Sequence, residues 1–398
     1  MTSEEKNVQP APKPRDFTAS VAVIKCPNYD AETVAKSLHT ALSYFGGIFA
    51  LIKPGQKVLI KPNMLNASSP EQAVVTHPSI VVAVAKLVKQ SGAIPFVGDS
   101  PAMGSGLQAG KQSGLFAMLQ EIGVEMVELK TPLEIDCPNG AVCKKVTISK
   151  EITQFDALIN ISKYKTHGLT GYTAAIKNIF GVVPGMRKAQ YHLEKSERED
   201  FCRFIVDLAG LIQPTLNIID MVVGMEGEGG PASGILKPMG LLLASQDIAA
   251  VDAVACEITG LPLEKNMLLQ YAAEKNIGET NLNKIEVRGE TIDSVRVSDF
   301  KHIDFTAKKS PFAMMPKWLL NWLKKLMLQK PVFSQLKCTR CGNCVKICPP
   351  QAIEMGRRTP EVNYNKCIRC FCCLEVCPSK AITVEKSWIS KMREKLGF

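Results

Sequence analysis

The sequence predicts an α/β fold, in which helices cover both faces of a mostly parallel sheet, followed by a small cysteine-rich domain. Short apolar runs rich in β-branched residues alternate with helical patterns from residue 20 to residue 303. These runs are apolar throughout, as expected for strands that are buried on both faces. Nine of the 14 cysteines fall between Cys338 and Cys377, and the other five are scattered over the preceding chain.

Each element of the α/β part has its own local signal. Strands are expected at 21–24, 57–61, 94–98, 125–129, 157–162, 216–223 and 241–244. Helical periodicity is found at 31–41, 78–90, 113–121 and 248–258. One more strand is expected within 142–148, and the structure from residue 289 to residue 305 stays open.

Composition excludes several classes of protein. With 398 residues, 46% of them hydrophobic and 22% charged, the chain is typical of a globular protein of two or three domains. No apolar run reaches the roughly 18 residues that a membrane-spanning helix needs. The first twenty residues are polar and rich in proline, unlike a secretory signal. We therefore expect a cytoplasmic protein.

The net charge of +10 is concentrated in one stretch, because residues 305–337 hold seven lysines and no acidic residue. Within this stretch, segment 313–329 has apolar residues at helical spacing and predicts an amphipathic helix. The simpler interpretation is a linker helix that packs its apolar face on a domain; the alternative is a helix that contacts a membrane surface or a partner. The expected divisions are a disordered N-terminal tail (1–19), the α/β domain (20–305), the basic linker helix (306–335), the cysteine-rich domain (336–386) and a C-terminal tail (387–398).

The cysteine-rich segment contains an internal repeat at an offset of 29 residues, since 338–353 aligns with 367–382. Both halves have the pattern C-x2-C-x2-C-x3-C-P, which is typical of bacterial proteins with two iron–sulfur clusters. In that pattern the fourth cysteine of each run ligates the other cluster. The predicted ligands of cluster 1 are Cys338, Cys341, Cys344 and Cys377. The predicted ligands of cluster 2 are Cys367, Cys370, Cys373 and Cys348.

The ninth cysteine, Cys372, aligns with Asn343 and is not expected to be a ligand. Zinc is the alternative metal, because paired C-x2-C motifs also form zinc ribbons. Two complete four-cysteine runs, each followed by proline, differ from the ribbon spacing and favour two [4Fe-4S] clusters. Over about 50 residues the segment resembles the dicluster bacterial ferredoxin family, which implies one-electron transfer.

Polar residues follow five of the expected strands. These loops contain Lys61 and Asn63, then 98–101, 162–168, 225–231 and 245–247. Because ligands bind at the carboxyl ends of strands in open parallel sheets, we expect all five loops to line one cleft. The motifs of the usual dinucleotide-binding, P-loop and serine-hydrolase sites are absent from the sequence.

The residue types in these loops suit an anion and a proton transfer. Lysine and asparagine donors for a phosphate or carboxylate are Lys61, Asn63, Lys165, Lys177 and Asn178. The predicted catalytic residues are His167, Lys163 and Asp99. Acidic side chains (Asp99, Glu226, Glu228, Asp247) could instead hold a divalent cation, so an additional anionic cofactor or cation stays open. For each lysine or histidine taken alone, a solvated or structural role is the alternative.

Five separated motifs carry a second resemblance. They are 61–63, 98–101, 163–167 with 175–178, 181–185 and 226–231. Occurring in this order, they resemble the family called domain of unknown function 362, over about residues 20–260. The polar positions typical of that family fall here on Lys61, Asn63, Asp99, Lys163, Lys165, His167, Lys177, Asn178, His192 and Glu226. The family resemblance implies a ferredoxin segment in many members, but no settled activity.

Three functions are compatible with these features. The first is a ferredoxin-linked oxidoreductase that exchanges electrons with a small anion in the α/β cleft. The second is a non-catalytic electron carrier whose α/β domain docks a partner, and the third is an assembly protein for iron–sulfur or metal cofactors. The expected partner is a redox protein such as a ferredoxin, flavodoxin or reductase. Nucleic-acid binding is not expected, because no basic platform with interleaved aromatic residues is present.

Overall fold

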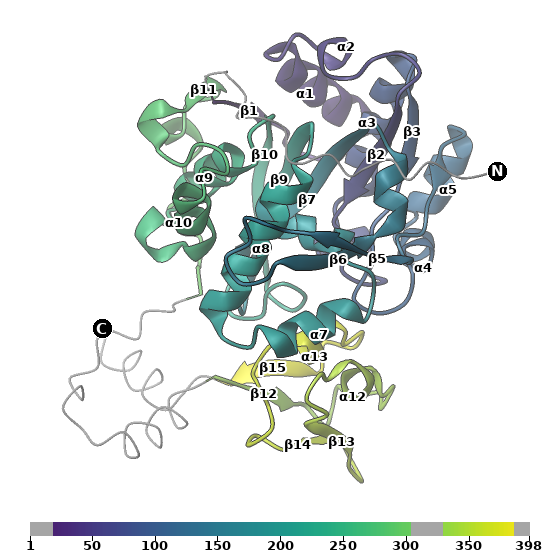
Figure 1. The fold of residues 1–398 in the computed structure, drawn as a ribbon, viewed down its shortest axis with the longest axis vertical. Helices are drawn as coiled ribbons and strands as arrows, with labels where there is room; N and C mark the ends of the chain where they lie inside the picture. Colours follow the sequence, from purple (N-terminus) through teal and green to yellow (C-terminus); the bar gives the residue numbers. More distant parts are fainter. Residues whose placement is uncertain (1–18, 304–328, 386–398) are drawn as a thin grey trace.

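The computed structural model describes residues 19–303 and 329–385. A larger α/β domain lies above a small C-terminal domain in Figure 1. The expected tails at 1–19 and 387–398 and the basic helix at 313–329 lie almost entirely outside the described residues. No helix within the described ranges combines the length and the apolar character needed to cross a bilayer.

The large domain is built on one mixed sheet, which confirms the predicted fold class. The strand order along the sheet is β11-β1-β10-β9-β7-β2-β3-β4, with β8 pairing to β7. The strands are β1 (Ser20–Lys25), β2 (Lys57–Pro62), β3 (Ile94–Val97), β4 (Glu125–Met126), β7 (Ala157–His167), β8 (Gly171–Thr173), β9 (Leu216–Glu226), β10 (Ile235–Ser245) and β11 (Glu286–Gly289). Strands β4, β3, β2, β7 and β9 run parallel to one another, whereas β10 runs antiparallel to both β1 and β9.

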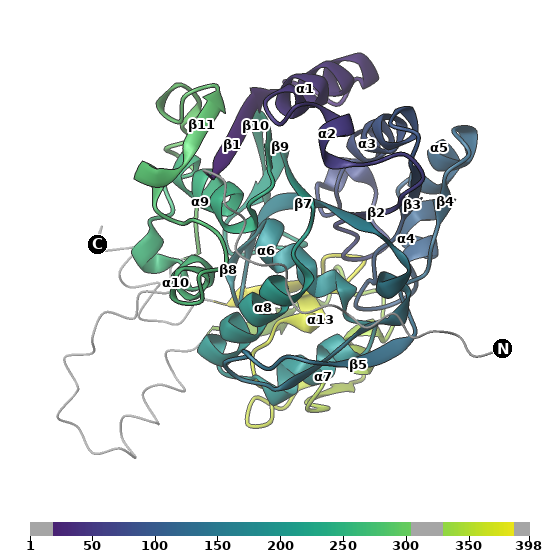
Figure 2. The same cartoon turned by 45° about the horizontal axis from the view of Figure 1, so that its top comes forward.

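Alternation along the strands divides the apolar side chains between two cores. On β1, Val21 and Val23 belong to one core, whereas Ala22 and Ile24 belong to the other. Helices α1 (Ala31–Ser43), α3 (Pro78–Gln90) and α5 (Leu115–Glu121) cover one face, and α8 (Arg198–Ile212), α9 (Ile248–Ile258) and α10 (Met267–Glu274) cover the other. Figure 2 shows these two layers on either side of the sheet. The central strand β7 is buried along its whole length, as expected for a strand covered on both faces.

The remaining elements of the large domain are shorter. The expected strand within 142–148 is β6 (Lys145–Ser149), which pairs with β5 (Pro132–Asp136) in a separate antiparallel hairpin. Short helices α2 (Ile48–Leu51), α4 (Gly106–Gln112), α6 (Ala175–Asn178) and α7 (Arg187–Glu194) complete the described helices of this domain, together with 3-10 turns at 70–72, 150–154, 179–182, 263–265, 282–284 and 293–295. Helix α7 lies between the sheet and the C-terminal domain in Figure 1.

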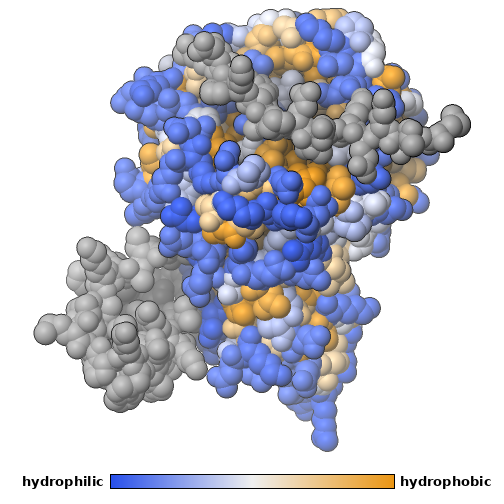
Figure 3. Space-filling view, in the orientation of Figure 1, coloured by the Kyte–Doolittle hydropathy of each residue, from blue (hydrophilic) through white to orange (hydrophobic). Residues whose placement is uncertain are grey.

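The C-terminal domain contains two small antiparallel ribbons and two short helices. Strand β12 (Lys330–Phe333) pairs with β15 (Ile382–Glu385), and β13 (Ile353–Met355) pairs with β14 (Pro360–Val362). The helices are α12 (Asn343–Ile347) and α13 (Cys372–Glu375). In the orientation of Figure 3, both domains carry mainly hydrophilic side chains with smaller hydrophobic areas.

The backbone of the C-terminal domain repeats as the sequence does. Left-handed φ values occur at Arg340 and Arg369, at Gly342 and Phe371, and at Gln351 and Lys380. Each of these pairs is separated by the 29 residues of the sequence repeat. The two cysteine runs therefore fold into two equivalent loops.

Candidate functional site

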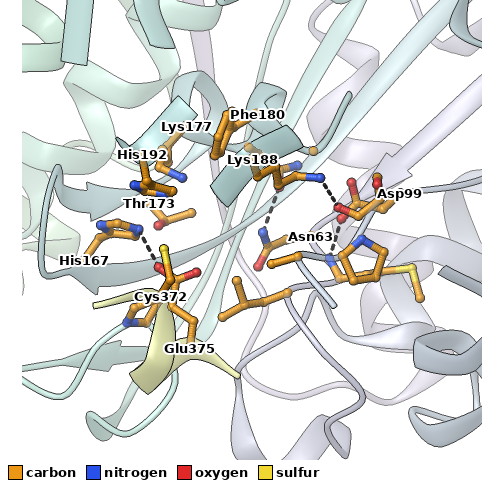
Figure 4. Close-up of a pocket in the computed structure, with 18 of the residues that line it drawn as sticks. Asn63, Asp99, His167, Thr173, Lys177, Phe180, Lys188, His192, Cys372 and Glu375 are labelled. Atoms are coloured by element: carbon orange, nitrogen blue, oxygen red, sulfur yellow. Dashed lines mark hydrogen bonds and ion pairs between the residues drawn. The ribbon is translucent and has the colours of Figure 1, made fainter. Parts of the chain in front are cut away.

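A hollow lies where the α/β domain meets the C-terminal domain. The loops after β2 and β3, the end of β7 and helices α6 and α7 form its walls on the α/β side. Ile347 of α12 and Cys372 and Glu375 of α13 form its wall on the other side. Its lining residues with polar or charged side chains are Asn63, Asp99, Ser100, Lys165, His167, Thr173, Lys177, Asn178, Lys188, His192, Cys372 and Glu375 (Figure 4).

The expectation that five loops line one cleft is only partly correct. The loops after β2 and β3 do so, and the loop after β9 contributes Pro231. The expected loop at 162–168 contributes Lys165 and His167, but these belong to β7 itself, because the strand extends to His167 and does not end at residue 162. The loop at 245–247 does not, because β10 runs antiparallel to its neighbours and therefore ends at the opposite edge of the sheet. There the Asp247 carboxylate accepts hydrogen bonds from the first backbone N–H groups of α9 and acts as a helix cap.

Three lysine side chains line the hollow, and none of them is paired with a carboxylate in the described residues. Lys165 Nζ donates to Asn63 Oδ1 at 2.8 Å and to the carbonyl of Val74. Lys188 Nζ donates to the carbonyl of Ser100 at 2.6 Å and to that of Val183. Burial lowers the pKa of both Lys165 and Lys188 to about 7.

Lys177 is the least satisfied of the three. Its Nζ lies 4.7 Å from the ring centre of Phe180 and makes no hydrogen bond or ion pair with the residues that the structure describes. Burial lowers the pKa of Lys177 from its ordinary value. A cation that faces a hollow without an acceptor is suited to bind an anion there.

Two histidines lie beside these lysines. His167 Nδ1 accepts hydrogen bonds from the backbone N–H groups of Leu169 and Thr170 at 3.1 and 3.3 Å. The proton of the neutral ring is therefore on Nε2, which lies 3.2 Å from Glu375 Oε1 of the C-terminal domain. Burial lowers the pKa of His167, so the neutral ring is the form favoured near pH 7. The carboxylate of Glu375 stays charged, because the hydrogen bond from His167 and nearby cations lower the pKa of Glu375 to about 2 despite its burial.

His192 is buried to 96% and stacks on Phe201, with ring centres 4.3 Å apart. Its Nδ1 has no hydrogen-bond partner, and burial lowers its pKa to about 3, so the ring is neutral. A buried polar nitrogen without a partner is costly unless something binds it. Together with Lys177, it leaves the hollow with unused donor and acceptor groups.

The predicted pair Lys61 and Asp99 forms the floor of the hollow. Lys61 Nζ lies 2.9 Å from Asp99 Oδ1, and the backbone N–H of Met64 donates to Asp99 Oδ2 at 2.7 Å. Gly181 covers this pair, and a Cβ at that position would collide with both side chains. Asp99 lines the hollow, whereas the fully buried Lys61 lies beneath it.

The side chains of the two predicted asparagines are hydrogen-bonded to other side chains of the protein. Asn63 Nδ2 donates to Asn178 Oδ1 at 2.9 Å, and Asn178 Nδ2 donates to Asn160 Oδ1 at 2.8 Å. Because Asn63 Oδ1 also accepts from Lys165, this chain of hydrogen bonds fixes the position of the Lys165 ammonium.

Lys163 lies apart from the hollow. Its Nζ contacts Tyr29 Oη at 2.6 Å and Asp220 Oδ2 at 2.9 Å. Strand alternation would place Lys163 and Lys165 on one face, but the pairing of β7 with β9 shifts register between them. Lys163 is therefore satisfied by a buried carboxylate, and its predicted catalytic role has no support from the lining of the hollow.

Lys188, Cys372 and Glu375 are additions to the site residues predicted from the sequence, whereas His192 was indicated there only by the family resemblance. Lys188 and His192 are four residues apart on α7, so their shared helix face was a usable signal. The two residues of α13 come from the other domain and left no such signal. Glu226 and Glu228 do not line the hollow, and no group of three or more histidine, cysteine or acidic side chains in the described chain converges on one ion position.

The cysteine runs fit the predicted cluster ligands. Cys338, Cys341, Cys344 and Cys377 all line a second hollow. Four cysteines around one hollow agree with the ligand set predicted for a single cluster.

The second set of cysteines is also brought together. Cys348 and Cys373 each interact electrostatically with both Cys367 and Cys370. Backbone N–H groups donate to sulfur in a repeated way, from Ala352 to Cys348 and from Ala381 to Cys377, both at 3.2 Å. Such N–H bonds to sulfur are typical of iron–sulfur sites. The cysteines of each predicted ligand set thus lie near one another.

Comparisons with known proteins agree with this division of the chain. A family model described as domain of unknown function (DUF362) matches residues 58–257, and a 4Fe-4S dicluster domain model matches residues 330–378. The "Thylakoid-associated protein sll1697" of Synechocystis is 36% identical over 260 residues, which are 65% of this chain and 79% of that protein. The lactate racemase apoprotein of Thermoanaerobacterium thermosaccharolyticum aligns with a TM-score of 0.39 and 13% identity, covering 62% of this chain and 58% of that one.

Proposed function

The chain belongs to the DUF362 family and is an iron–sulfur protein, and from this premise we propose that it is an oxidoreductase acting on a small anion held between its two domains. Two [4Fe-4S] clusters supply one-electron transfer when bound. Cys338, Cys341, Cys344 and Cys377 would hold cluster 1. Cys348, Cys367, Cys370 and Cys373 would hold cluster 2.

The single observation that carries this proposal is the shared wall of the hollow. Cys372 lines the hollow and stands between the ligands Cys370 and Cys373 in sequence, and Ile347 precedes the ligand Cys348. The wall that a bound molecule would touch is therefore made of direct neighbours of the cluster 2 ligands. A domain that merely stored electrons would gain nothing from this contact.

The charges of the hollow favour an anion. Lys177 has no acceptor among the described residues, and Lys165 and Lys188 have only neutral oxygen partners. The two carboxylates of the lining are already engaged, Asp99 by Lys61 and Glu375 by His167. A phosphate or carboxylate would complete the coordination of these cations.

His167 lies at the edge of the hollow as a neutral ring held in one orientation. Backbone donors to Nδ1 fix its tautomer, so that Nε2 carries the proton. Glu375 accepts that proton's hydrogen bond and orients the ring. Because both ring nitrogens of His167 are engaged, we propose that His167 positions Glu375, with Lys177 as the anion clamp and Lys165 and Lys188 in support.

The test is purification without oxygen, followed by assays of iron, sulfide and any small molecule released on denaturation. About eight iron atoms per chain are expected from two clusters. Lys177→Met should retain the iron but weaken binding of the released anion about 10- to 100-fold, the usual value of a charged hydrogen bond. Lys36→Met, an equal change at an exposed position of α1, is the control.

Equal retention of the anion by Lys177→Met and Lys36→Met would contradict the assigned site. Eight iron atoms with no bound molecule in any preparation would favour a non-catalytic electron carrier.

A further inference from the structure

The hollow around the cluster 1 cysteines is separate from the proposed substrate site. It shares no lining residue with the hollow between the domains. Cys341 is exposed, whereas the other eight cysteines of this segment are buried or half-buried. The C-terminal domain therefore has an inner side, at α13, and an outer side, at Cys341.

Basic residues gather on the outer side. Arg340 lines the hollow, and its Nη1 donates to the carbonyl of Gly356 at 3.1 Å and to that of Arg357. These bonds hold the turn between β13 and β14, with Arg357 and Arg358, beside the hollow. Lys337, next to Cys338, is exposed as well.

The charge on this side is not balanced locally. Exposed basic residues in 336–361 are Lys337, Arg340, Lys346, Arg357 and Arg358, against the exposed acidic residues Glu354 and Glu361. Within residues 336–361 the excess is thus 5 − 2, or three positive charges. Neither Arg357 nor Arg358 has an ion pair in the described residues.

Two large apolar side chains stand among these charges. Leu336 is fully exposed and Met355 is 39% exposed, and they are the exposed large hydrophobic residues of the described C-terminal domain. Met355 lies against Gly342, which lines the hollow. Apolar side chains inside a charged rim are characteristic of protein interfaces.

We propose that this surface, the outer basic face formed by Leu336, Lys337, Arg340, Met355, Arg357 and Arg358, docks an acidic one-electron carrier protein of the flavodoxin type. Charge complementarity selects such a carrier, because its negative surface would meet the unpaired arginines. One electron lost by the carrier is gained by the C-terminal domain, so the exchange balances without a further reactant. The inference rests on the proposed electron-transfer function but not on the anion site.

The experiment measures binding of an acidic flavodoxin to the complete, cluster-loaded protein by titration calorimetry at low and at moderate salt. The double variant Arg357→Glu/Arg358→Glu should weaken binding at least 10-fold at low salt and flatten its salt dependence. The matched control Lys36→Glu/Lys53→Glu reverses two exposed charges near α1 and α2, at the opposite end of the molecule (Figure 1), and should stay within about twofold of the unmodified protein.

A second measurement follows the loss of visible iron–sulfur absorbance on mixing with reduced flavodoxin. Its second-order rate should fall in the arginine variant in parallel with binding. Photoreduction with deazariboflavin, whose small uncharged radical carries electrons from the sacrificial donor EDTA, should proceed alike in all proteins and shows that the variant's clusters are intact. Equal rates for the arginine and control variants, or no flavodoxin binding to the unmodified protein, would overturn the proposal.

Lys177→Met separates this proposal from the proposed function. It should bind flavodoxin as the unmodified protein does, because it changes only the inner hollow. Loss of anion binding with intact docking would support both proposals. Docking without any anion site would leave the outer basic face standing and remove the oxidoreductase.

Discussion

Lys163 and Lys165 are two residues apart on one buried strand, yet their surroundings are opposite. Lys163 meets Asp220 and Tyr29, whereas Lys165 meets only an amide oxygen and a backbone carbonyl. Both are fully buried, so burial alone does not distinguish a structural lysine from a functional one. What distinguishes them is whether a carboxylate already neutralises the charge.

The largest effect expected from this difference between the lysines is on the stability of the fold. Lys163→Met would leave Asp220 charged and buried without its cation, and should lower the free energy of unfolding by about 3–5 kcal/mol. Lys177→Met removes a cation with no carboxylate partner and should change it by less than about 1 kcal/mol. Chemical unfolding of both variants, followed by circular dichroism, tests the difference.

The double variant Lys163→Met/Asp220→Asn is the control for that experiment, because it removes both charges. It should recover part of the lost stability. If Lys177→Met proves as destabilising as Lys163→Met, the division into structural and functional lysines is wrong.

The second effect is on anion binding as pH changes. Lys165 and Lys188 have pKa values lowered to about 7, so raising the pH through 7 removes their charges. Affinity for inorganic pyrophosphate, used as a probe anion in titration calorimetry, should fall about 10-fold between pH 6 and pH 8.5. Lys165→Arg, which stays charged, should reduce this fall.

The lowered pKa values of Lys165 and Lys188 make the stability of the fold change with pH in the direction opposite to the anion affinity. Between pH 7 and the ordinary pKa of lysine, the unfolded chain binds more protons at these two positions than the folded one, so their contribution makes the fold more stable as pH rises. An anion affinity that is independent of pH would mean that Lys165 and Lys188 do not contact the anion.

The smallest effect concerns the carboxylate of the hollow. Glu375→Gln keeps an oxygen that accepts the His167 Nε2–H hydrogen bond but removes a negative charge beside the three lysines. Pyrophosphate should bind a few times more tightly, since the repulsion is partly screened. Weaker binding by this variant would show that Glu375 itself contacts the ligand.

Much of the fold follows from the sequence, because apolar strands and helical periodicity are local properties. The seven expected strands are all present, and the sheet is mostly parallel. The direction of β10 could not be predicted. The segment between the expected strands at 216–223 and 241–244 is long enough for either a hairpin or a crossover to a parallel strand. That one reversal moved Asp247 away from the cleft.

The site was predictable where its residues follow strands. Lys165, His167 and Asp99 were found in this way, and all three line the hollow. The register shift that separates Lys163 from Lys165 depends on pairing with a distant strand, which no local pattern reveals. The wall from α13 depends on how the two domains meet, and this is a property of their surfaces as a whole.

The repeat in the C-terminal domain bears on which of its two halves faces the α/β domain. If the two halves of a duplicated domain were identical, either half could pack against the α/β domain equally well. Here the half containing α13 has Phe371, Cys372 and Glu375 where the other half has Gly342, Asn343 and Lys346. Phe371 keeps a left-handed backbone that favours glycine, and its ring lies against Gly168 of the larger domain. Lys346 in place of Glu375 would repel the lysines of the hollow. These three differences between the halves thus allow only one half to pack against the α/β domain, and the other half stays available to a partner.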